Sequence, residues 1–223
     1  MYEKGARSVE LFVAKGRSPF WIDVATAVSV GLGVAEAVLG GMGNSNALLA
    51  NATENLDNIT YGLDSIAARR EYDRRLNHRL RRGAGALITL AATYVAGNSI
   101  YDLYYNKYPT VPSELAGLSV GSAVLDGVIA AGLNKHAQPG TTHRDAFRHS
   151  SADTISSVIA AGAIVASSHG FPTVDAYTGL VLSGWTILMT FPTNSRIKNA
   201  DNLFVNSINP TSKLSDNQPK PQV

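Results

Sequence analysis

Residues 145–153 read Asp-Ala-Phe-Arg-His-Ser-Ser-Ala-Asp, and they open an apolar stretch that ends near Ser168. His149 and Asp153 are four residues apart, so on a helix they lie on one face, about one turn from each other. An imidazole and a carboxylate in this arrangement can supply two of the ligands of a divalent cation. Residues 154–168 are rich in Ile, Val, Ala and Ser, which predicts that the helix continues into lipid. Because ionisable side chains in such a helix are costly, the pair predicts a functional site facing the interior of a helical bundle.

The chain as a whole is poor in charge. Only 16% of its 223 residues are charged, against 45% hydrophobic residues, whereas about a quarter of a soluble domain is charged. The sequence contains no cysteine, which excludes disulfides and thiolate metal sites and leaves nitrogen and oxygen ligands. Residues 1–20 lack the compact apolar core and small-residue cleavage site of a signal peptide, so we interpret them as a cytoplasmic N-terminal arm.

Six segments of about 20 residues predict an all-α integral membrane protein with six transmembrane helices. The second of them is too polar to face lipid and can cross only if its polar groups face a wet or metal-filled interior. The predicted domain organisation is an arm at 1–20, a six-helix transmembrane domain at 21–192 and a disordered cytoplasmic tail at 193–223. The predicted helices are Trp21–Met42, Ala47–Ala68, Gly83–Tyr105, Leu115–Leu133, Ala146–Ser168 and Val174–Phe191.

Basic residues predict the orientation of these helices. Arg69–Arg82, which we expect to form a loop, contains seven arginines, and Lys135–Arg148 is also basic. The turns at 43–45, 106–112 and 169–173 contain a single Lys. The positive-inside rule therefore predicts a multi-pass protein of the cell (inner) membrane with both termini in the cytoplasm. The arginines are expected to contact anionic lipid, and they lack the interleaved aromatic residues, beyond Tyr72, that would indicate nucleic-acid binding.

Three segments together resemble the cation diffusion facilitator family of divalent metal transporters. Residues 43–58 (Gly-Asn-Ser-Asn-Ala-Leu-Leu-Ala-Asn-Ala-Thr-Glu-Asn-Leu-Asp-Asn) resemble the end of the family's first helix and the start of its second. Residues 145–153 resemble its fifth-helix motif of His, three residues and Asp, and residues 174–180 resemble the opening of its sixth helix. The resemblance covers roughly Trp21–Phe191.

The resemblance implies a transporter rather than an enzyme, with no prosthetic group. Such proteins exchange a divalent metal ion, commonly zinc, for protons across a lipid bilayer and typically work as dimers; iron, manganese and cobalt are the other candidate cargoes. Family members usually carry a cytoplasmic metal-binding domain after the sixth helix. The segment from Pro192 to Val223 is too short and too polar for that domain, so we expect the transmembrane domain alone.

The resemblance also implies a metal site with two ligands from the second helix and two from the fifth. In this sequence the four positions are Glu54, Asn58, His149 and Asp153. Asn58 stands where the family has Asp, so the site would carry less negative charge. Three further candidate ligands are Asp57, which is rotated by about 100° on the helix, Asn51, which replaces a usual aspartate, and Asp145, which the helix dipole alone can explain.

Other polar residues leave alternatives open. Glu36 and Asp126 lie within apolar runs, where they could relay protons or pair with an arginine or a backbone group. Asp175 is interpreted as a helix N-cap near the outer face. His136 and His143 could collect metal at the cytoplasmic mouth or be solvated loop residues.

Two rival functions remain at this point. The first is a non-transporting membrane subunit, in a homodimer or in a heterodimer with a related transporter, which serves as an assembly or regulatory partner. Asn58 and the expected lack of a cytoplasmic domain motivate it. The second is a soluble alanine-rich helical protein, motivated by a mean hydropathy of only +0.01. A measurement of metal flux would distinguish the non-transporting subunit from a transporter. Partitioning into the aqueous fraction without detergent would identify the soluble protein.

Overall fold

The computed structural model describes residues 20–63, 74–135, 137 and 142–208, and the regular structure in these ranges is helical throughout. This confirms the predicted all-α class. A short helical stretch at 59–63 follows the second helix. The helices are α2 (Phe20–Met42), α3 (Asn46–Asp57), α5 (Arg74–Tyr105), α6 (Leu115–Asn134), α7 (Thr142–Ser168) and α8 (Thr173–Ile208).

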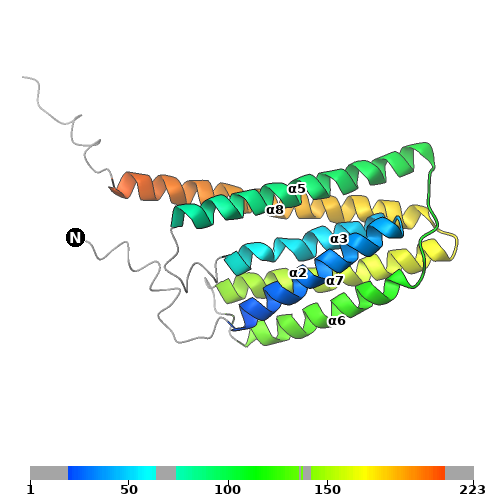
Figure 1. Ribbon diagram of the computed structural model, residues 1–223, viewed down its shortest axis with the longest axis horizontal. Helices are drawn as coiled ribbons and strands as arrows, with labels where there is room; N and C mark the ends of the chain where they lie inside the picture. Colours follow the sequence, from blue (N-terminus) through cyan, green and yellow to red (C-terminus); the bar gives the residue numbers. More distant parts are fainter. Residues whose placement is uncertain (1–19, 64–73, 136, 138–141, 209–223) are drawn as a thin grey trace, which may run out of the picture.

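The helices form an elongated bundle in which α5 and α8 lie side by side along one flank (Figure 1). The other four pack against one another, with α6 on α7 and α2 on α3, and α3 also contacts α8. The start of α2 and the end of α8 lie at one end of the bundle, which we call the terminal end. The connections α2–α3, α5–α6 and α7–α8 lie at the opposite end, which we call the turn end.

Four helices are long and apolar enough to cross a membrane: α2, residues Arg79–Tyr105 of α5, α6, and residues Arg144–Ser168 of α7. Helix α3 is shorter than predicted, because it ends at Asp57 with Asn58 as its C-cap. Its 12 residues span only about 18 Å. It is packed between α2, α5, α7 and α8, and nine of its residues are buried. Its polar side chains therefore face protein, as the prediction for this helix required.

Burial in this bundle is the reverse of that in a soluble protein. Many large apolar side chains lie on the outside, among them Val38, Leu87, Val128 and Val181, each more than half exposed. The interior contains alanine together with many serine, asparagine and carboxylate side chains. An apolar outer surface of this extent is suited to lipid, so the arrangement supports an integral membrane protein and weighs against the soluble alternative.

Short polar turns end three of the helices at the turn end. Asn44 has φ 51° directly after α2, Asn106 has φ 53° after α5, and Gly170 has φ 96° after α7. Asn and Gly tolerate this left-handed conformation better than other residues. The side chain of Ser45 then accepts a hydrogen bond from Leu48 N and caps α3. The structure therefore has turns at 43–45, 106–112 and 169–173, as predicted.

Besides the end of α3, three predicted boundaries differ from the structure. The loop predicted at Arg69–Arg82 is wrong for residues 74–82, because these residues form the first turns of α5. Arg and Leu are good helix formers, and this propensity does not show in a hydropathy profile. Helix α7 already begins at Thr142. Helix α8 passes Pro192 and continues to Ile208, into the segment predicted to be disordered. Residues 1–19, 64–73 and 209–223 and His136 lie outside the described residues, so the arm, the rest of the arginine run and the end of the tail remain predictions.

Candidate metal site

Helices α3 and α7 bring three of the four predicted ligands into contact, Asn58, His149 and Asp153. Glu54 and Asn58 lie at the end of α3, and His149 and Asp153 lie in the first half of α7, which packs against it. Each pair has a spacing of four residues, which places both members on one helix face. Glu54, Asn58 and Asp153 are at most 5% exposed, and the side chain of His149 is 16% exposed. The site is thus enclosed, and its imidazole is the part nearest to solvent.

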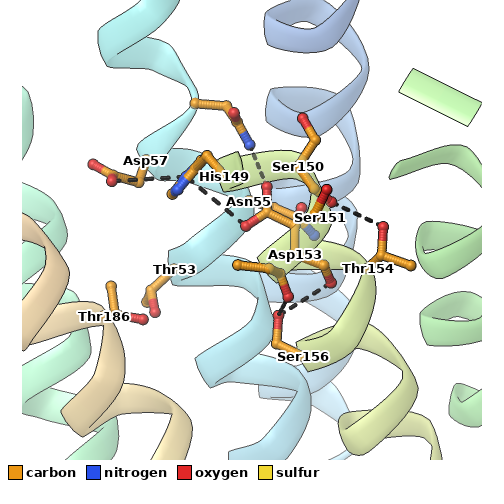
Figure 2. A network of polar contacts seen from close by, with 12 residues as sticks. Thr53, Asn55, Asp57, His149, Ser150, Ser151, Asp153, Thr154, Ser156 and Thr186 are labelled. Atoms are coloured by element: carbon orange, nitrogen blue, oxygen red, sulfur yellow. Dashed lines mark hydrogen bonds and ion pairs between the residues drawn. The ribbon is translucent and has the colours of Figure 1, made fainter. Parts of the chain in front are cut away.

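Asp153 is the centre of this group. Asn58 Nδ2 donates a hydrogen bond of 2.7 Å to Asp153 Oδ2, and His149 Nε2 lies 3.8 Å from Asp153 Oδ1. Glu54 precedes Asn58 by about one turn on α3. Figure 2 shows His149 between Asp57 and Asp153, joined to each by a dashed line. The predicted pairing of the two helices is therefore present in the geometry.

Asp57 reaches the site in spite of its rotation on the helix. His149 Nε2 lies 3.8 Å from Asp57 Oδ2, the same distance as from Asp153. Helix α3 ends at Asp57, so this residue lies at the rim of the bundle, where its side chain can reach across to α7. Of the three further candidate ligands, Asp57 is the one that contacts a predicted ligand directly.

Several polar atoms of the site have no hydrogen-bond partner. They are both carboxylate oxygens of Glu54 and the Nε2 atom of His149. Leaving buried polar atoms unpaired costs about 1–3 kcal/mol for each group, so these atoms are available to a ligand, as are others elsewhere in the bundle, such as the hydroxyls of Ser99 and Ser183. Within the described residues, however, no three His, Asp or Glu side chains are grouped closely enough to hold a metal ion. Coordination would require the side chains to rearrange, and the Asn58 amide would have to turn its oxygen inward.

The two other candidate ligands lie elsewhere. Asn51 Nδ2 donates to Glu36 Oε1 at 2.7 Å and to Ser157 Oγ at 3.1 Å, in a separate polar cluster. Asp145 is exposed in the first turn of α7, where the helix dipole explains it. Neither has a contact with the four predicted ligands among the described hydrogen bonds and ion pairs.

Glu36 and Asp126 are both completely buried, and the structure separates their roles. Glu36 accepts three hydrogen bonds, from Asn51, Asn55 and Ser122. Neither carboxylate oxygen of Asp126 has a hydrogen-bond partner. Among the described residues, no ion pair joins a Lys or Arg side chain to either carboxylate.

Asn55, Ser122 and Ser157 belong to the polar interior but were not predicted from the sequence. A weak signal existed, because Asn55 lies four residues after Asn51 and Ser157 lies four after Asp153, which places each on a functional face. Asn55 and Ser122 both donate to Glu36 of α2, whereas Ser157 bonds to Asn51. The pairing of α2 with α3 was therefore needed to reveal their role.

Asp175 is an N-cap, but for a helix other than its own. Its two carboxylate oxygens accept hydrogen bonds from Ser45 Oγ and from Asn46 N, both at 2.7 Å. Asp175 lies in the first turn of α8, whereas the groups that it binds begin α3. The residue thus ties α3 to α8 at the turn end, and it is not close to the candidate metal site.

Comparison with known proteins agrees with this architecture. The family model of the cation efflux transmembrane domain matches residues 22–195, which is most of the chain and includes both α3 and α7. A search of curated proteins gave no match. The matched region contains every residue of the candidate site, and the bundle has the apolar exterior of a membrane protein. The chain therefore belongs to the cation efflux family, the cation diffusion facilitators, and is an integral membrane cation transporter of that kind.

Proposed function

We propose that the protein carries a divalent metal cation across the membrane in exchange for protons, with zinc as the first candidate cargo and iron, manganese and cobalt as the others. The observation that carries this proposal is the contact between α3 and α7: His149 lies 3.8 Å from both Asp57 and Asp153, and Asn58 donates to Asp153. Imidazole and carboxylate ligands suit zinc and the other first-row divalent ions. Glu54, Asn58, His149 and Asp153 would bind the ion, with Asp57 as a further ligand at the rim.

Coupling to protons follows from the chemistry of these ligands. His149 can bind a metal ion only in its neutral form, and carboxylates bind it best when ionised, so metal binding releases protons. Protons arriving from the opposite side would compete the metal off the same atoms. Asp126 is the better placed of the two candidate proton relays, because its oxygens have no hydrogen-bond partner whereas each oxygen of Glu36 already accepts at least one hydrogen bond. Exchange would then occur by alternating access around a fixed site, without a chemical step.

A non-transporting membrane subunit remains the second candidate, and one observation favours it. Asn58 donates its amide hydrogen to Asp153, so two of the four predicted ligands are engaged with each other. A protein that keeps this bond throughout would preserve the fold and could serve as the partner in a dimer. In either case we propose that the protein forms such a dimer, that it lies in the cell membrane, and that both of its termini are cytoplasmic.

Flux into proteoliposomes tests the transport proposal. Purified protein is reconstituted, a pH gradient is imposed, and zinc, manganese, iron and cobalt uptake are measured for the parent, His149→Ala and Asp153→Ala. We expect gradient-driven uptake by the parent and its loss in both variants. Asp145→Ala is the matched control on the same helix, because its carboxylate is exposed, and its flux should equal that of the parent. If the folded parent moves none of the four metals, the transport proposal fails and the non-transporting subunit is the candidate function that remains.

A further inference from the structure

A second buried polar cluster joins four helices next to the candidate metal site. We call it the Glu36 layer; it consists of Glu36, Asn51, Asn55, Ser122 and Ser157. Glu36 Oε1 accepts hydrogen bonds from Asn51 Nδ2 at 2.7 Å and from Ser122 Oγ at 2.6 Å. Glu36 Oε2 accepts one from Asn55 Nδ2 at 2.7 Å, and Ser157 Oγ donates to Asn51 Oδ1 at 3.2 Å. All five residues are at most 1% exposed.

Asn51 and Ser157 of the layer lie on the turn-end side of the metal site, and Asn55 lies level with the site, between Glu54 and Asn58 on α3. Helix α3 runs away from the turn end, and Asn51 precedes Glu54 on it by about one turn. Helix α7 runs toward the turn end, and Ser157 follows Asp153 by about one turn. With Glu36 from α2 and Ser122 from α6, the layer crosses the four-helix part of the bundle. An ion that moved between the metal site and the turn end through the middle of these four helices would meet Glu36, Asn51 and Ser157.

Within the described ranges, no basic side chain is paired with the carboxylate of the layer. Among the described residues Glu36 has no Lys or Arg partner, and its three hydrogen-bond donors are neutral. A carboxylate at this depth in a lipid-spanning bundle is costly without a partner of opposite charge. The electrostatics of the layer therefore favour a cation.

The groups around Glu36 can change from hydrogen-bond donors to cation ligands. Rotation of an asparagine amide replaces its nitrogen by its oxygen, and a serine hydroxyl can accept a cation on its lone pairs. Asn55 Oδ1 is already buried without a hydrogen-bond partner. Carboxylate, amide and hydroxyl oxygens together form an all-oxygen ligand set, the kind that manganese, magnesium and calcium ions prefer.

We propose that the Glu36 layer is a second cation-binding position, an all-oxygen station that the transported ion occupies between the metal site and the turn end. This inference rests on the proposed transport function. It differs from the metal site in its ligand chemistry, because the layer contains no imidazole. The station binds the ion through Glu36, and the neutral amides and hydroxyls let the ion leave again.

Manganese is a suitable probe, because electron spin-echo spectroscopy of bound Mn²⁺ distinguishes imidazole nitrogen ligands from oxygen ligands. The full-length double variant His149→Ala/Asp153→Ala, in detergent, is titrated with Mn²⁺. We expect saturable binding of Mn²⁺ without imidazole nitrogen coupling, and at least tenfold weaker binding after Glu36→Gln is added. No saturable binding in the double variant, or binding that Glu36→Gln leaves unchanged, would overturn the proposal.

Two serines of α6 provide a matched pair of variants in the same background. Ser122 donates to Glu36, whereas Ser119 is equally buried and has no hydrogen-bond partner. Ser122→Ala should weaken Mn²⁺ binding several-fold, and Ser119→Ala should not; equal effects would contradict the station. This pair decides the question even if Glu36→Gln fails to fold. The metal site is tested separately by imidazole-coupled Mn²⁺ in the parent, so failure of one site is distinguishable from failure of the other.

Discussion

Asn58 is the residue at which this site departs most from an ordinary four-ligand metal site. Its amide donates to Asp153, so it compensates the neighbouring carboxylate in the absence of an ion. An aspartate in this position would be a better ligand but would face Asp153 directly. Two adjacent buried carboxylates repel each other unless a cation or a proton lies between them.

Asn58→Asp should therefore tighten zinc binding and destabilise the metal-free protein. We expect about tenfold higher affinity, equivalent to about 1.4 kcal/mol, and a lower thermal midpoint without metal that zinc restores. Isothermal titration and thermal unfolding in detergent measure the two effects. Asn58→Leu, which removes the hydrogen bond without adding charge, should lower the midpoint with no restoration by zinc. Unchanged zinc affinity in Asn58→Asp would show that residue 58 is not a ligand.

The two buried carboxylates Glu36 and Asp126 should respond in opposite ways to neutralisation. Glu36→Gln turns an amide nitrogen toward groups that already donate, so we expect a loss of about 1–3 kcal/mol of stability. Asp126→Asn removes a charge that accepts no hydrogen bond and should be neutral or stabilising. Thermal unfolding of both variants at one pH makes the comparison. A larger loss for Asp126→Asn than for Glu36→Gln would contradict it.

At the scale of the helices, the contact between α8 and α3 depends on Gly179. A Cβ atom at this position would lie 2.5 Å from Asn46 Cβ and 2.7 Å from Ser99 Oγ. Gly179→Ala should therefore separate α8 from the N-terminus of α3 and cost about 1–3 kcal/mol. Gly184→Ala, on the same helix with nothing within 4 Å, is the control and should be tolerated. Thermal unfolding compares them, and equal midpoints for the two variants would mean that the helices pack less closely there.

The helices that could be predicted from the sequence are those whose ends coincide with a change in hydropathy. Helices α2 and α6 have apolar sequences bounded by turns, and their predicted limits agree with the structure within one residue at each end. Helix α3 is polar and enclosed by protein, so its end at Asp57 is set by packing and by the cap at Asn58 rather than by a fall in hydropathy. The start of α5 was not predicted, because its arginines favour a helix while their low hydropathy suggests a loop.

The candidate site was predictable only in part, for a related reason. The spacing of four residues within α7 predicts His149 and Asp153 as a pair, and the family resemblance adds Glu54 and Asn58; the fold brings Asn58 into contact with Asp153. Contacts between helices, such as those of Glu36 with Asn55 and of Asp175 with Ser45, leave no periodic signal in the sequence of either helix. They depend on which helix faces which, and this is a property of the folded bundle.

At the scale of the whole molecule, the path of the chain through the membrane is the point on which transport depends. Four helices qualify as membrane spans by length and composition, and α3 and α8 do not. Nevertheless, the three connections at the turn end lie together, opposite the start of α2 and the end of α8 (Figure 1). This arrangement favours six crossings, because α3 and α8 then return the chain to the terminal end.

Because the chain contains no cysteine, single introduced cysteines can test the number of crossings directly. Met42, Ser113 and Phe171 are exposed near the turn end, and Lys135 is exposed after α6. With six crossings, a membrane-impermeant thiol reagent outside intact cells should label Met42→Cys, Ser113→Cys and Phe171→Cys, and should label Lys135→Cys only after the membrane is opened. If α3 and α8 did not cross, Met42 would lie on the side opposite to Ser113. Labelling of Met42→Cys without Ser113→Cys would therefore contradict the six-helix topology, and with it the placement of α3 as a helix that carries metal ligands across the bilayer interior.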